Sequence, residues 1–100
     1  MANTFKVLHR GNADTSSQTL YTTPVATTTL VNNVLVANTD TSSAVYTIAL
    51  DGFSMAASVG VPANDTAVLD IKQVLSASAT ITGYASASTV LFHVSGLEIS

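Results

Sequence analysis

Apolar and polar residues alternate over short runs along most of the chain, and clusters of turn-forming residues separate the runs. Alternation with a period of two is typical of β-strands, and turns at short intervals are typical of a sandwich or barrel. The pattern predicts an all-β fold: a single antiparallel β-sandwich domain over residues 1–100, jelly-roll-like, with about eight strands. The expected strands are residues 4–9, 19–22, 27–37, 44–50, 53–59, 67–73, 78–85 and 89–99.

One of these strands, residues 27–37, is apolar on both of its faces. Its apolar residues are Leu30, Val31, Val34, Leu35 and Val36. Such a strand belongs at the centre of a sheet or in an interface. Because one sandwich core covers only one face, we expect a neighbouring copy or another protein to cover the second.

The turns carry most of the acidic residues. Asp51-Gly52 is the strongest hairpin signal in the chain, because both residues accept a positive φ. If consecutive strands are antiparallel, successive turns alternate between the two ends of the domain. We therefore expect Asp14, Asp40 and Asp65 at one end and Asp51 at the other. Aspartate suits turns because its side chain bonds nearby backbone groups.

The inward-facing positions of the expected strands predict the hydrophobic core. In the first strand we expect Phe5 and Val7 to point inward, with Lys6 and Leu8 on the opposite face. Gly96 is expected to mark a bulge in the last strand. The predicted core is Phe5, Val7, Leu30, Val34, Val36, Ile48, Leu50, Leu69, Ile71, Val90, Phe92 and Val94.

Charge is scarce: Asp, Glu, Lys and Arg make up 9% of the chain and the net charge is −3, against about 25% charged residues in ordinary globular proteins. With Lys6, Arg10 and Lys72 as the only lysines and arginines, a basic surface for nucleic acid is excluded. No stretch approaches the ~18 apolar residues of a membrane helix, and we expect no export signal. The absence of cysteine favours folding in a reducing cytosol.

The residues that most chemistry requires do not form a recognisable motif. We interpret His9 as a solvated strand end and His93 as an outward-facing strand residue. No Gly-x-Ser-x-Gly or Asp-x-Asp pattern is present, so we expect no catalytic, cofactor-binding or metal-binding residues and no enzyme. The tyrosines leave one alternative open, a carbohydrate-binding or host-adhesion module. An exposed planar cluster of Tyr21, Tyr46 or Tyr84 would favour it, and burial of all three would count against it.

Several segments resemble small virion structural proteins of tailed bacteriophages. They are residues 1–6, residues 20–24 with 27–31, the step at 36–39 and the ending at 94–100. The resemblance consists of strand patterns that cover most of the chain, and the Ala/Ser-rich region 76–88 departs from it.

The resemblance implies a β-sandwich located in the virion after assembly in the host cytoplasm, and specifically a capsid decoration (cement) protein. The implied partners are the major capsid protein or other virion proteins, and further copies of this chain in a homo-oligomer, with a trimer as the first expectation. The alternative within the same class is a neck component or a tail fibre or adaptor.

Overall fold

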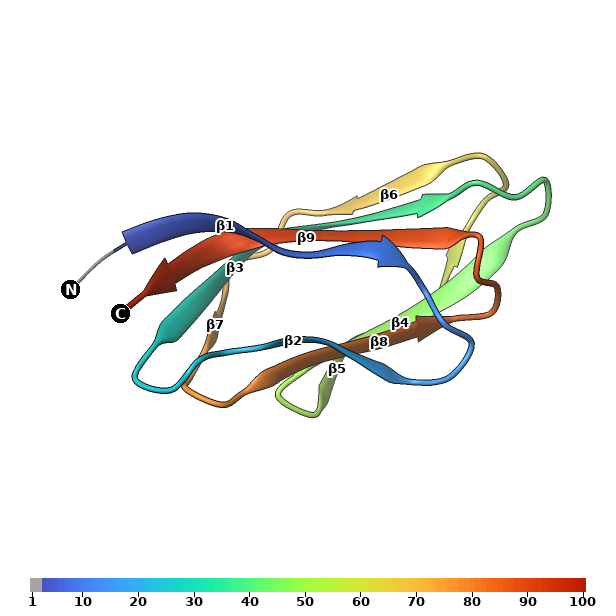
Figure 1. The fold of residues 1–100 in the computed structure, drawn as a ribbon. Coiled ribbons are helices and arrows are strands. Elements are labelled where there is room, and N and C mark those ends of the chain that lie inside the picture. The colour runs from blue at the N-terminus through green and yellow to red at the C-terminus, as the bar shows by residue number, and fades with distance from the viewer. Residues whose placement is uncertain (1–2) are drawn as a thin grey trace.

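A computed structural model describes residues 3–100, and it contains nine β-strands and no helix in that range (Figure 1). Consequently no helix within residues 3–100 is long and apolar enough to cross a membrane. The strands are β1 (Asn3–Asn12), β2 (Gln18–Thr22), β3 (Thr28–Asn38), β4 (Ala44–Leu50), β5 (Phe53–Val61), β6 (Thr66–Leu69), β7 (Gln73–Leu75), β8 (Thr80–Ala85) and β9 (Val90–Ile99).

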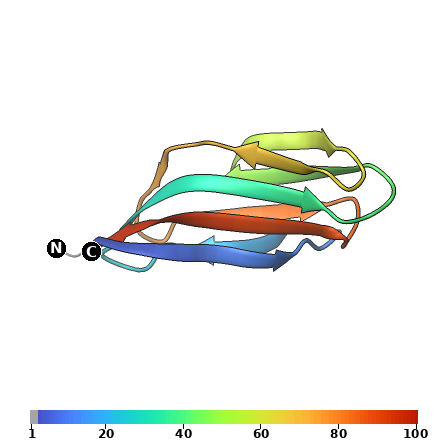
Figure 2. The same cartoon turned by 90° about the horizontal axis from the view of Figure 1, so that it is seen from above.

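The strands form two antiparallel sheets that pack face to face (Figures 1 and 2). One sheet has the order β1-β9-β3-β6, with β7 also paired to β3, and the other has the order β2-β8-β4-β5. The chain crosses repeatedly between the sheets, as in a double-sheet jelly roll. The antiparallel sandwich expected from the pattern is therefore confirmed. The structure has nine strands where about eight were predicted, because β6 and β7 both pair with the same edge of β3.

Most strand boundaries lie within two residues of the sequence prediction, but two predicted strands differ more. The first strand does not end at His9, because β1 pairs with β9 as far as Asn12. The predicted strand 67–73 is two short strands, β6 and β7, which pair with different parts of β3. Asp70 to Lys72 lie between them outside the ladder. In this segment the alternating pattern continues through a break in hydrogen bonding.

The core lies between the sheets and is built from alternate residues of the long strands. Val34, Val36, Val90, Phe92 and Val94 are fully buried, as predicted. Ile48 and Leu50 are also buried, and Leu69 and Ile71 are half-buried against the core. The predicted inward position of Leu30 is wrong: it is half-buried on the outer face, because Thr29 and Val31 take the inner positions. Buried residues that the prediction missed include Leu8, Val31, Tyr46, Val61, Leu75 and Ile81.

The predicted orientation of the first strand is wrong. Phe5 and Val7 are 88% and 47% exposed, whereas Leu8 is buried. The pairing of β1 with β9 shifts register between Val7 and His9, so Leu8 is an extra residue in a bulge. A bulge turns its extra residue out of the regular alternation. Phe5 and Val7 therefore lie on the outer face of the sheet.

The turns alternate between the two ends of the sandwich, as predicted. The turns that follow β1, β3 and β5 hold Asp14, Asp40 and Asp65 and lie at one end, on the right in Figure 1. The Asn64 N–H donates to the Asp40 carbonyl at 3.0 Å, which joins two of these turns. Asp51 lies at the other end, where β1 begins and β9 ends.

Candidate functional site

The outer face of the β1-β9-β3-β6 sheet carries a continuous row of apolar side chains. Phe5 of β1 is paired with Leu97 of β9, Leu97 with Leu30 of β3, and Leu30 with Val74 of β7. Directly paired side chains on one face of a sheet lie close enough to contact each other. Phe5 and Val74 are 88% and 66% exposed. The row therefore presents apolar surface across four neighbouring strands.

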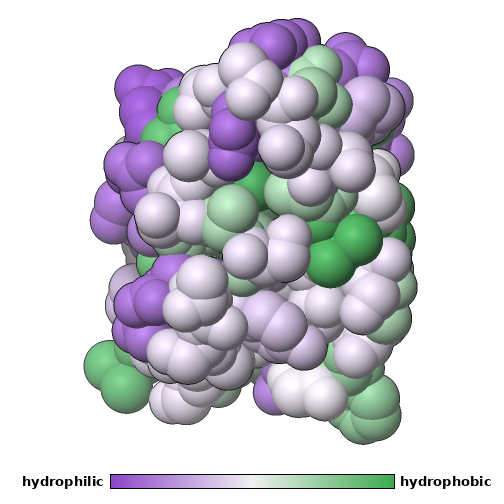
Figure 3. All heavy atoms as spheres, turned by 90° about the vertical axis from the view of Figure 1, so that its right-hand side faces the viewer, coloured by the Kyte–Doolittle hydropathy of each residue, from purple (hydrophilic) through white to green (hydrophobic). Residues whose placement is uncertain are grey.

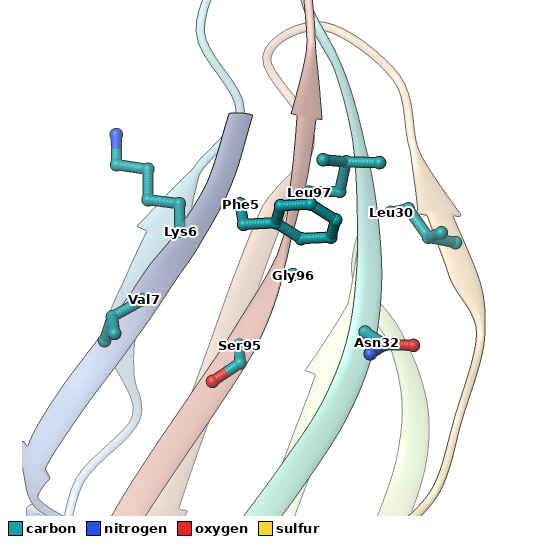
Figure 4. Close-up of a pocket in the computed structure, with 8 residues that line it drawn as sticks. All are labelled: Phe5, Lys6, Val7, Leu30, Asn32, Ser95, Gly96 and Leu97. Carbon is teal, nitrogen blue, oxygen red and sulfur yellow. The ribbon is translucent and has the colours of Figure 1, made fainter. Parts of the chain in front are cut away.

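A shallow groove of about 400 Å³ lies along this row. Figure 4 shows the Phe5 ring laid across β9 towards β3, beside Leu97 and Gly96, while the Lys6 side chain points away from it. The groove is lined by Phe5, Lys6, Val7, Leu30, Asn32, Ser95, Gly96 and Leu97. Because its lining is mainly apolar and its floor is a flat sheet, it suits contact with another apolar surface better than capture of a polar small molecule.

The apolar surface continues along the same face towards the turns. Leu35 of β3 is paired with Val68 of β6 on the outer side, and Val68 is 60% exposed. In the same row Leu35 is paired with His93 and His93 with Arg10. Arg10 is the one charged residue in these outer-face rows, and it lies on the edge strand β1. The expectation that residues 27–37 have two apolar faces, only one of them inside the sandwich, is confirmed.

The outer face of the other sheet has a different character. None of β2, β4, β5 and β8 contains an Asp, Glu, Lys or Arg residue. Thr19 of β2, Thr82 of β8, Ala49 of β4 and Ser54 of β5 form one cross-strand row on it. These strands are uncharged, and their outer face bears mainly small side chains, many with a hydroxyl group, together with the exposed Val45 and Tyr84. The two outer faces therefore differ in the chemistry of the partners that they suit.

A small polar cluster joins the two sheets behind the apolar row. The Tyr21 hydroxyl of β2 donates to Glu98 Oε2 of β9, and it lies 2.9 Å from Thr29 Oγ1 of β3. Lys6 Nζ lies 3.4 Å from the same Glu98 oxygen. The hydrogen bond from Tyr21 lowers the pKa of Glu98, and Lys6 lowers it further. Burial, together with the bond to Glu98, raises the pKa of Tyr21. The cluster holds β2 against the opposite sheet.

The three tyrosines lie in different surroundings. Tyr46 is 1% exposed and packs edge-on against Phe92, with ring centroids 6.4 Å apart. Burial raises the pKa of its hydroxyl. Tyr84 is 38% exposed on the outer face of β8, where it is paired with Thr47. They form no exposed planar cluster, so the observation that would favour an adhesion module is not met. Because Tyr84 is exposed, burial of all three, which would count against such a module, is not met either.

The two histidines do not lie together in one site. His93 is outward-facing, as predicted, and half-buried in the middle of its sheet. His9 is not a solvated strand end, because β1 continues past it and its Nε2 atom is buried without a hydrogen-bond partner within residues 3–100. It follows the Leu8 bulge directly, which is why a prediction based on strand ends misplaced it.

The aspartates at the turn end serve their own turns. In each, one carboxylate oxygen accepts a hydrogen bond from the backbone N–H of the following threonine, at 2.7 Å for Asp14, 2.6 Å for Asp40 and 2.8 Å for Asp65. Over the part of the chain that the structure describes, no three His, Cys, Asp or Glu side chains are placed to hold a metal ion. Figure 3 views this end, where strongly hydrophilic atoms gather at the top and left margins.

A second groove, of about 380 Å³, lies between the β4–β5 hairpin and β7. Leu50, Phe53 and Met55 line one side of it, and Val74 and Leu75 line the other. Phe53 is 77% exposed. The groove lies between β5, the edge strand of one sheet, and β7, at the edge of the other, where the two sheets are not joined.

Comparison with known proteins supports the fold. No protein-family model matches the sequence, and no curated protein matches it. A chain in the solved structure of infectious bursal disease virus, Gx strain, aligns with a TM-score of 0.57 at 17% identity over 97% of this chain and 30% of that chain. This chain has the fold of part of a viral protein.

Two structures of a pentameric capsid protein isolated from metagenomic phage sequences align more loosely. Their TM-scores are 0.41 and 0.40 at 19% identity, over 95% of this chain and 62% and 64% of those chains. In all three alignments the chain spans less than two thirds of the protein that it matches.

Proposed function

We propose that this chain is a non-enzymatic structural protein of a bacteriophage virion, and most specifically a decoration protein of the assembled head. The observation that carries the proposal is the apolar row formed by Phe5, Leu97, Leu30 and Val74 on the outer face of one sheet. An apolar surface rimmed by polar residues is typical of a protein interaction site. A decoration protein stabilises the head by covering part of its surface, so it needs a large contact area and no catalytic site.

The virion setting is supported by two independent observations. The strand patterns of the sequence resemble small virion structural proteins of tailed phages. The described fold is similar to part of a chain of infectious bursal disease virus. A decoration protein that binds only the assembled shell stabilises it by mass action.

The low charge agrees with this role. Few strongly hydrated groups are lost when an uncharged surface is covered, so its desolvation is cheap. None of β2, β4, β5 and β8 carries a charged residue. Binding to the particle should therefore depend little on long-range electrostatics, and it should persist at about 1 M salt, where such forces are screened.

Electron microscopy of phage particles with and without the purified protein tests the proposal. Protein density at regular positions on the head is the expected result, unchanged when salt is raised. Density only at the neck or tail would instead establish the alternative, an adaptor or fibre component. Particles that neither contain nor bind the protein would overturn the virion role.

A further inference from the structure

We propose that the apolar outer face of the β1-β9-β3-β6 sheet is covered by the same face of a second copy, in a dimer with two-fold symmetry. This inference rests on the proposed role of that face as an assembly surface, but not on the identity of the particle. In the dimer the two apolar faces contact each other, so the two uncharged β2-β8-β4-β5 faces point outwards and are the sheet faces left to contact the particle.

Chemical complementarity selects the occupant. The row of Phe5, Leu97, Leu30 and Val74 needs an apolar partner, because it offers little to satisfy polar groups. The other outer face exposes mainly threonine, serine and alanine, as in the row from Thr19 to Ser54. Its exposed apolar side chains, Val45 and Tyr84, are paired with Gly60 and Thr47 and form no apolar row. Within the described residues, the outer sheet face that matches the apolar row is therefore that row itself. A contact in which one patch meets its own copy is isologous and closes as a two-fold dimer.

The available area is sufficient for such a dimer. Four strand positions at a spacing of about 4.8 Å, and ten residues of β9 at about 3.3 Å each, give a face of roughly 600 Å² in projection. Two such faces bury roughly 1,200 Å², which reaches the lower end of the range of about 1,200–2,000 Å² found in stable interfaces. The corrugation of the side chains adds to this projected area.

The distribution of charge on the face also permits self-contact. Arg10 is exposed on the edge strand β1, so in a face-to-face dimer it lies on the rim, where water can solvate it. The central strands β9 and β3 contribute leucine, serine, asparagine and His93 to the face. An interface with an uncharged centre and a polar rim is the ordinary arrangement.

This arrangement differs from the trimer expected from the sequence. A closed trimer is built from heterologous contacts, in which two different patches meet. The described part of the chain presents one apolar row that crosses a whole sheet face. Its second exposed apolar groove, at Phe53 and Met55, lies at the edge between the two sheets and not on a sheet face. The dimer is therefore the assembly that these surfaces favour.

Sedimentation of the full chain between about 1 and 100 µM provides the first test. We expect a reversible dimer. Val7→Glu, on the apolar face, should raise the dissociation constant by about 10-fold or more, because a carboxylate would be buried in the contact. Val45→Glu is the matched control: Val7 and Val45 are 47% and 42% exposed on the outer faces of different sheets. A monomer throughout this range, or equal weakening by both variants, would overturn the proposal.

Cross-linking tests the symmetry directly, because the chain contains no cysteine. Ser95→Cys places one thiol in the middle of the apolar face, and Thr82→Cys places one at the corresponding central strand of the other sheet. In an isologous dimer, residues near the axis meet their own copies, so a short bis-maleimide should link Ser95→Cys into dimers and leave Thr82→Cys monomeric. A trimer or a ladder of higher species from Ser95→Cys would contradict the two-fold contact. Circular dichroism of each variant confirms that it is folded.

These results are separable from the test of the virion role. A monomer that nevertheless decorates particles would refute the dimer and leave the proposed function standing. A dimer that is absent from particles would refute the proposed function and leave the contact established.

Discussion

Gly96 lies against the backbone of Leu30, so closely that a Cβ atom on Gly96 would be 2.3 Å from the Leu30 carbonyl oxygen. The same Cβ would be 2.9 Å from Leu8 Cδ1. β9 does not itself bulge at Gly96; the bulges lie in its neighbours, where Leu8 and Asn32 are the extra residues. Gly96 leaves the space that the buried Leu8 side chain occupies.

Gly96→Ala should therefore destabilise the protein by about 2 kcal/mol or more, since backbone must move to admit the methyl group. A urea melt of each variant measures the loss. Gly60→Ala is the control, because a Cβ there would meet nothing within 4 Å. Equal stability of the two variants would show that β9 and β3 can separate at little cost.

Truncation of Phe92 should cost much more stability than truncation of Phe5. Phe92 is fully buried, so Phe92→Ala should cost about 3–5 kcal/mol through lost transfer energy and a cavity. Phe5 is 88% exposed, and Phe5→Ala should cost less than about 1 kcal/mol in the monomer. Denaturant melts of the two variants, at a protein concentration well below that at which the chain self-associates, compare the two losses of stability. A large loss from Phe5→Ala would indicate that Phe5 and Val7 face inward after all.

The hydroxyls of Tyr21 and Tyr46 should also differ in their contributions. Tyr21 donates to Glu98, so Tyr21→Phe should destabilise the fold by about 1 kcal/mol. The Tyr46 hydroxyl is buried with no hydrogen-bond partner within residues 3–100. Tyr46→Phe should therefore leave stability unchanged or raise it, because removing an unpaired buried polar group removes its desolvation cost. Thermal melts of both variants measure the two effects. A larger loss of stability from Tyr46→Phe than from Tyr21→Phe would show that the Tyr46 hydroxyl does make a stabilising hydrogen bond.

Acid should weaken the fold through Glu98. Its pKa is lowered in the folded state, chiefly by the hydrogen bond from Tyr21, below the ordinary value of 4.5. The stabilisation is therefore complete above pH 4.5 and is lost as the pH falls through the lower folded pKa. Melting temperatures from pH 6 to pH 3 should fall less steeply for Glu98→Gln than for the natural protein. Parallel curves would show that Glu98 is not the titrating group.

Alkali should act through the tyrosines. The pKa values of Tyr21 and Tyr46 are raised, in both cases first by burial. A raised tyrosine pKa contributes stability that is complete below pH 10 and is lost as the pH rises through the folded value. The melting temperature should thus decline above pH 10, and the double variant of Tyr21→Phe and Tyr46→Phe should reduce that decline. An unchanged decline would assign it to other groups.

Local chemistry made several elements predictable. Asp51 and Gly52 have φ values of 53° and 80°, as the hairpin signal required, and β4 and β5 flank them. The placement of Asp14, Asp40 and Asp65 at one end followed from antiparallel alternation alone. The hairpin inference used two adjacent residues, and the placement of the aspartates used the number of strands between the turns. Neither required knowledge of which distant strands pair.

Alternation along the sequence by itself determined the all-β class, most strand positions and the two apolar faces of β3. An alternation with a period of two shows which residues of a strand share a face. It does not show which of the two faces meets the opposite sheet. In β1 the inward face is set by the Leu8 bulge and by the absence of a side chain at Gly96, which leaves room for Leu8. Both features arise only when β1, β9 and β3 lie side by side. The tertiary structure alone therefore placed Phe5 beside Leu97 on the outer face, because pairing between the two ends of the chain aligns residues far apart in the sequence.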